Sequence, residues 1–93
     1  MVLYVITKII DGDSIVVNHK TKIRIANIDV VGLEANKAAV KYLKAHWLHR
    51  EVELLDDPNQ VKKVVHGEHV KFVIANGINL SEKLLAFGVR LKF

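Results

Sequence analysis

The stretch that decides the fold runs from residue 9 to residue 29 and reads IIDGDSIVVNHKTKIRIANID. An apolar segment leads into the acidic turn Asp11-Gly12-Asp13, and a β-branched segment follows it. The polar residues 18–21 then predict a reversal into a third apolar segment, which ends at Asp29. Turns and strand ends are held by a sheet yet remain open to a ligand, so we expect chemistry at the acidic turn, Arg24 and Asp29.

The remaining segments complete a mainly β pattern with helices. Strands are predicted over residues 2–10, 14–18, 22–28, 51–55 and 69–74, the main helix over 32–48, and a short C-terminal helix, capped by Asn79 and closed by Gly88, over 79–87. A five-stranded pattern with the main helix between the third and fourth strands is typical of an OB-type barrel. The sequence therefore predicts one such domain over residues 1–93.

Composition narrows the class of protein. The chain has 93 residues, of which 51% are hydrophobic, and this suffices for one domain with its own core. It has no cysteine, which excludes disulfides and thiolate metal sites. The apolar run at residues 2–6 is too short for a signal-peptide core, and no segment approaches the roughly 20 residues of a membrane-spanning helix. We therefore expect a soluble, cytoplasmic protein without a membrane partner.

The net charge of +4 is dispersed over the chain. Lys37, Lys41 and Lys44 recur at helical spacing, so they share one face of the predicted main helix. Lys62 and Lys63 form a basic pair in a predicted loop. We interpret such charges first as a solvated surface and second as a contact for nucleic acid.

The ordered set around the acidic turn resembles the staphylococcal-nuclease-like family. The likeness is carried by Ile10-Asp11-Gly12-Asp13-Ser14-Ile15, Arg24 and Asp29, then by Gly32-Leu33-Glu34-Ala35 at a helix start and Ala75-Asn76-Gly77 before a short helix. That family builds an OB barrel with helices, and its active members cleave phosphodiesters with calcium. The likeness implies the same fold for nearly the whole chain.

The resemblance also implies roles for single residues. Asp13 and Asp29 match the two calcium-binding aspartates of active members, and Asp11 matches a further acidic position beside them. Arg24 matches the first of two arginines that neutralise the phosphate. Carboxylate oxygens are ligands that calcium prefers. DNA or RNA would then contact Arg24, with the basic pair Lys62-Lys63 as a further contact.

Two functional groups of the family pattern are absent. Active members carry a glutamate three residues after the second aspartate, where this chain has Gly32, and Glu34 belongs to the helix-start motif instead. They carry a second arginine before the last strand, where this chain has Glu68. A general base is worth about 10² to 10⁴ in rate and a charge clamp about 10² to 10³, so losing both costs on the order of 10⁴ to 10⁷. We therefore expect no efficient nuclease.

Histidine and tryptophan offer two weaker signals. His46 and His49, like His66 and His69, are three residues apart, which resembles the spacing of metal ligands. Without a cysteine or a clear third ligand, ordinary surface or core histidines are the better interpretation. Trp47 falls on the apolar stripe of the main helix, which favours packing over base stacking.

Three functions stay open. The first, which we favour, is a catalytically degenerate nuclease-like domain that binds nucleic acid or phosphate through the relic site. The second is a weak calcium-dependent phosphodiester nuclease. The third is a protein-interaction or structural domain in which the aspartates and Arg24 form an ion network.

Overall fold

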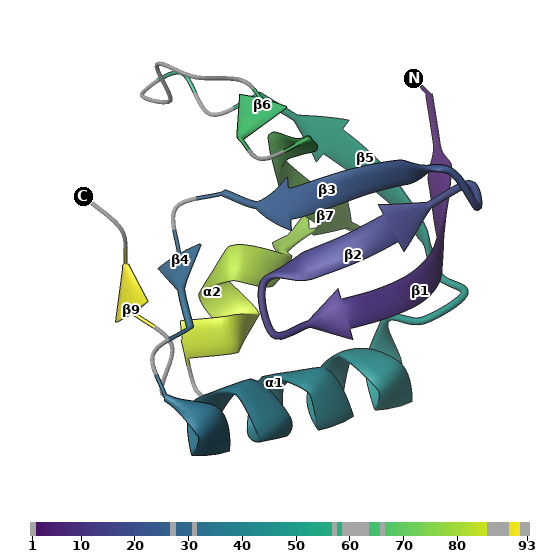
Figure 1. Ribbon diagram of the computed structural model, residues 1–93. Coiled ribbons are helices and arrows are strands. Elements are labelled where there is room, and N and C mark those ends of the chain that lie inside the picture. Colours follow the sequence, from purple (N-terminus) through teal and green to yellow (C-terminus); the bar gives the residue numbers. More distant parts are fainter. Residues whose placement is uncertain are drawn as a thin grey trace.

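The computed structural model describes residues 2–26, 28–30, 32–56, 58, 64–65, 67–85 and 90–91. Its architecture is mainly β, with two helices (Figure 1). The strands are β1 (Tyr4–Asp11), β2 (Ser14–Val17), β3 (Thr21–Ile25), β4 (Ile28–Asp29), β5 (Glu51–Leu55), β6 (Val64–Val65), β7 (Glu68–Ala75), β8 (Ile78–Asn79) and β9 (Arg90–Leu91). The helices are α1 (Leu33–His46) and α2 (Leu80–Leu84).

Five of these strands close into a barrel, which confirms the predicted OB-type fold. β1, β2 and β3 form an antiparallel meander, and β5 pairs antiparallel with both β1 and β7. The parallel pairing of β3 with β7 closes the ring. Because a closed sheet has no free edge within the ring, every barrel strand has backbone partners on both sides. β6 and β8 each pair antiparallel with β7, and β4 pairs antiparallel with β9.

Alternating side chains of the hairpin fill the barrel. Ile15 and Val17 of β2 and Ile23 and Ile25 of β3 are buried in the core. Successive side chains of a strand point to opposite faces, so Arg24 lies on the outer face of the barrel wall. Trp47, directly after α1, is also buried in this core, which confirms the packing role that its position predicts.

Helix α1 packs beside β1 and covers one end of the barrel (Figure 1). It begins after Gly32, whose φ of 93° suits glycine, and it buries Ala39 and Leu43 against the core. Gly12, in the turn between β1 and β2, lies so close to α1 that an added Cβ would come within 3.0 Å of Asn36 Oδ1 and 3.1 Å of Ala39 Cβ. The acidic turn is therefore pressed against the helix.

The prediction of a third strand over residues 22–28 is wrong at the C-terminal end of the strand. β3 stops at Ile25. The Ala26 N–H still donates to the Lys71 carbonyl of β7 at 2.8 Å, as the parallel pairing of the two strands requires, whereas the Ala26 carbonyl accepts from the side chain of Ser81, from Oγ, at 2.6 Å. Ile28 then begins the separate strand β4. The chain turns away from the barrel wall at this point.

The short C-terminal helix begins as predicted. Asn79 caps α2, and its side-chain oxygen accepts from the Ser81 N–H at 3.0 Å. Gly88, the predicted end of this helix, lies outside the described residues. Of the helices that the structure describes, none has the length and apolar character to cross a membrane.

Candidate functional site

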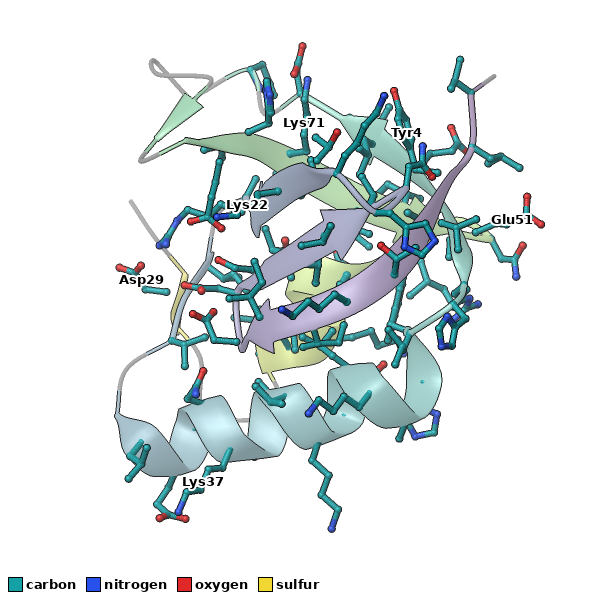
Figure 2. The ribbon with its side chains drawn as sticks, turned by 45° about the vertical axis from the view of Figure 1, so that its right-hand side comes forward. Tyr4, Lys22, Asp29, Lys37, Glu51 and Lys71 are labelled. Atoms are coloured by element: carbon teal, nitrogen blue, oxygen red, sulfur yellow. The ribbon has the colours of Figure 1, made fainter. Side chains whose placement is uncertain are left out.

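The candidate site lies where three chain segments meet at one end of the barrel. Asp11 is the last residue of β1, Asp13 follows in the turn to β2, Arg24 belongs to β3 and Asp29 to β4. Figure 2 shows Asp29 at the outer side of β4, where the chain leaves β3. We call Asp11, Asp13, Arg24 and Asp29 the Asp-Arg cluster.

The guanidinium of Arg24 bridges two carboxylates of this cluster. Its Nη1 nitrogen lies 3.3 Å from Asp13 Oδ2, and its Nη2 nitrogen donates to Asp29 Oδ1 at 2.8 Å. The Asp13 side chain is 13% exposed and that of Arg24 22%, whereas that of Asp29 is 47% exposed. The pair with Asp13 is therefore the shielded one, and Asp29 is the partner that solvent reaches.

Negative charge exceeds positive charge in the cluster. The pKa of Asp13 is raised to about 6, first by burial and then by the neighbouring Asp11, while Arg24 lowers it. An aspartate beside an arginine usually has a lowered pKa. Desolvation and the second carboxylate thus outweigh the guanidinium at Asp13.

The turn that carries Asp13 is fixed by the backbone and by α1. The Asp13 N–H donates to Asp11 Oδ1 at 3.2 Å, and the Asp13 carbonyl accepts from the Ile25 N–H at 2.8 Å. The Gly12 N–H donates to Asn36 Oδ1 of α1 at 2.7 Å. Sequence reasoning missed Asn36; its polar side chain one residue after Ala35, beside the apolar stripe of the helix, was the available signal. These hydrogen bonds fix the position of the turn, and with it the Asp13 carboxylate, without the help of a bound ligand.

Among the described residues, the carboxylates do not form a complete cage for a calcium ion. Asp13 and Asp29 both direct oxygens at one cationic group, Arg24. Over the part of the chain that the structure describes, no three acidic or histidine side chains gather closely enough to hold a metal. Calcium takes 6 to 8 oxygens, so a phosphate and water would have to supply most of them.

The remaining predicted positions lie apart from this cluster or outside the described residues. Glu34 is exposed in the first turn of α1, and Gly32 precedes that helix. Glu68 begins β7, two residues before Val70, the residue that pairs with Arg24 across the parallel strands. His46, His49 and His69 are exposed, and the predicted positions Lys62, Lys63 and His66 lie outside the described residues.

Comparison with known proteins supports no function for this chain, so any assignment of function rests on the geometry of the Asp-Arg cluster. The sequence matches no protein-family model, and it matches no curated protein.

Proposed function

We propose that this chain is a staphylococcal-nuclease-like OB domain that binds phosphate groups of a nucleic acid at the Asp-Arg cluster, with a divalent cation, and that does not cleave efficiently. The observation that carries the proposal is the guanidinium of Arg24 held between Asp13 and Asp29 on the outer wall of the barrel. An arginine in such a fork can offer two donors to a phosphate. The likeness to the nuclease-like family supports the same choice of ligand.

Charge balance makes the proposed binding depend on a cation. Two carboxylates contact the one guanidinium, and Asp11 adds a third negative charge beside Asp13, so an incoming phosphate meets net repulsion at neutral pH. Calcium bound by Asp13 and Asp29 would supply the missing positive charge and coordinate the phosphate oxygens. Arg24 would then turn from the exposed Asp29 toward the phosphate while it keeps the shielded Asp13.

The absence of a positioned base argues against efficient cleavage. The family position of the base is Gly32, which has no side chain to accept a proton. Glu34 is exposed on α1, and the carboxylates of Asp13 and Asp29 are held by Arg24. A candidate base has to lie within hydrogen-bond reach of the proton that it removes. We therefore expect the domain to bind nucleic acid without cleaving it efficiently.

Fluorescence anisotropy with labelled single-stranded DNA and RNA at low salt tests the proposal. We expect binding in calcium that is at least tenfold weaker in EDTA. Arg24→Ala should weaken binding by about 10- to 100-fold, since hydrogen bonds to charged groups contribute about 1.5 to 3 kcal/mol. Asp13→Asn should lose the calcium dependence. Lys20→Ala, in the exposed turn after β2, removes one charge elsewhere and should leave affinity unchanged.

Three results would overturn parts of this proposal. Affinity that is equal in calcium and EDTA and insensitive to Arg24→Ala rejects the site. Degradation of either oligonucleotide in calcium, lost in Asp29→Ala, establishes the nuclease alternative. No binding at low salt in either buffer favours the structural or protein-interaction alternative.

A further inference from the structure

A groove lies between the outer face of β1 and helix α1, on a surface that the Asp-Arg cluster does not use. Its volume is about 690 Å³. Ile10, Val40 and Ala45 give it apolar walls, and Lys37, Lys41 and Lys44 line it from α1. Asn36, whose Oδ1 accepts from the Gly12 N–H of the acidic turn, lies at its border.

Part of the apolar surface in and beside this groove is exposed. Ile10 is 42% exposed at the end of β1, and Leu33 is 68% exposed in the first turn of α1. Single exposed apolar residues are ordinary on protein surfaces. Here Leu33 and Val40 recur at helical spacing on the face that carries the lysines, and Ile10 opposes them from β1. Ile10 and the half-buried Val40 line the groove, and Leu33 lies on the same face of α1 beyond the residues that line it; these three positions mark an apolar path along α1.

The lysines follow this path at a regular spacing. Lys37, Lys41 and Lys44 stand four and three residues apart, so the row spans roughly 10 Å at 1.5 Å per residue. All three are exposed, and Figure 2 shows Lys37 extending from α1 away from the barrel. Lysine stems can cover apolar surface while the ammonium groups stay in water. The groove thus combines apolar walls with a cationic rim.

We propose that this groove docks an acidic amphipathic helix of a protein partner. A helix laid along α1 has the same rise per residue, so its carboxylates at spacings of four and three residues come opposite the three lysines. Its apolar side chains then contact Ile10, Val40 and Leu33, as in other complexes of a helix in a groove.

The chemistry of the groove favours a peptide over nucleic acid. No aromatic side chain is among the groove-lining residues that the structure describes, so bases have no stacking platform there. A nucleic acid that contacted the lysines only through its phosphates would leave the apolar walls of the groove exposed to water. The charge of the rim and the apolar character of the walls are both satisfied by one acidic, amphipathic segment.

A labelled helical peptide tests the docking directly. The probe is a fluorescein-labelled designed helix of about 18 residues, long enough to be helical in water, with leucines on one face and glutamates flanking them. We expect saturable binding by anisotropy that weakens with salt. The triple variant Lys37→Glu, Lys41→Glu, Lys44→Glu should weaken it at least tenfold. Ile10→Ser, at an exposed position, should weaken it about three- to tenfold.

A matched variant separates local docking from the loss of net charge. Lys20→Glu, Lys22→Glu, Lys83→Glu changes three exposed lysines elsewhere by the same total charge and should keep affinity within about threefold. Circular dichroism verifies that each variant is folded; if the glutamate variant is not, the corresponding triple glutamine variant takes its place. A second peptide with the same glutamates but serine for leucine should bind at least tenfold more weakly.

Four outcomes overturn the proposal. They are absence of peptide binding at low salt, equal loss in the two triple variants, equal binding of the serine peptide, and displacement of the peptide by single-stranded DNA. The last result assigns the groove to nucleic acid. None of the altered groove residues belongs to the Asp-Arg cluster. A failed peptide-binding test therefore does not count against the proposed phosphate site, and a failed nucleic-acid-binding test does not count against the proposed peptide groove.

Discussion

Replacing Asp13 by Asn tests whether the Asp-Arg cluster serves the stability of the fold. Asparagine has the shape of aspartate without its charge, and so resembles the protonated side chain. Burial and Asp11 raise the pKa of Asp13 to about 6 from 3.8, so the folded protein holds this proton more tightly than the unfolded chain does. At neutral pH the folded protein must carry the unfavourable charge. Asp13→Asn should therefore increase the free energy of unfolding.

The size and the pH dependence of this gain follow from the same pKa. A difference between 3.8 and about 6 corresponds to at most about 3 kcal/mol. Between these values the folded state binds more protons than the unfolded state, so the contribution of Asp13 to stability decreases as pH rises through this window and is constant above it. The gain of the variant is then largest above about pH 7 and falls to about 1 kcal/mol at pH 4.5.

Thermal and urea unfolding at pH 7.5 and pH 4.5, followed by circular dichroism, measures this difference. At the higher pH we expect the midpoint temperature to rise by up to roughly 12 to 24 °C, since 1 kcal/mol shifts a domain of this size by about 4 to 8 °C. The control is Asp29→Asn, which contacts the same guanidinium but is far more exposed and should change stability by less than about 1 kcal/mol. A variant at Asp13 that is less stable than wild type at pH 7.5, or equally stabilised at both pH values, would refute the reasoning.

Three further substitutions test how the site is supported. Gly12→Ala should cost about 1 to 3 kcal/mol in urea unfolding, because the new methyl group collides with Asn36 and its neighbours on α1; an unchanged midpoint contradicts the close approach. Ser81→Ala should cost about 1 to 3 kcal/mol, because the Ala26 carbonyl loses its buried donor, and thermal unfolding measures the loss. Asn79→Ala should cost about 1 kcal/mol through the lost cap of α2, and stability equal to wild type in urea would show that the cap is dispensable.

The barrel strands could be predicted because their side chains alternate. Ile15 and Val17, and then Ile23 and Ile25, alternate with residues that face outward, and the polar turn between the two strands sets the hairpin. The end of β3 could not be predicted in this way. The prediction extends this strand to residue 28 because Ala26 and Ile28 are apolar. In the structure the Ala26 carbonyl accepts from Ser81, a residue remote in sequence, and no local pattern indicates that contact.

The members of the site could be predicted, but the energetics of the site could not. Strand ends and turns placed Asp13, Arg24 and Asp29 within one region, and the structure brings them into contact. The turn that carries Asp13 is held against α1, where the Gly12 N–H donates to Asn36 Oδ1. No local pattern in the sequence reports the docking of a helix on a turn.

The raised pKa of Asp13 bears on the role of the cluster. Arg24 lowers the pKa of its buried partner, as arginines beside carboxylates usually do, but burial and Asp11 outweigh it. The net pKa is raised, so the ionised carboxylate opposes folding at neutral pH. A buried charge that opposes folding is typical of binding sites, where the bound ligand supplies the compensating charge. Bound calcium and phosphate should therefore stabilise the wild-type protein and leave Asp13→Asn unaffected, which links the unfolding and anisotropy measurements to one charge.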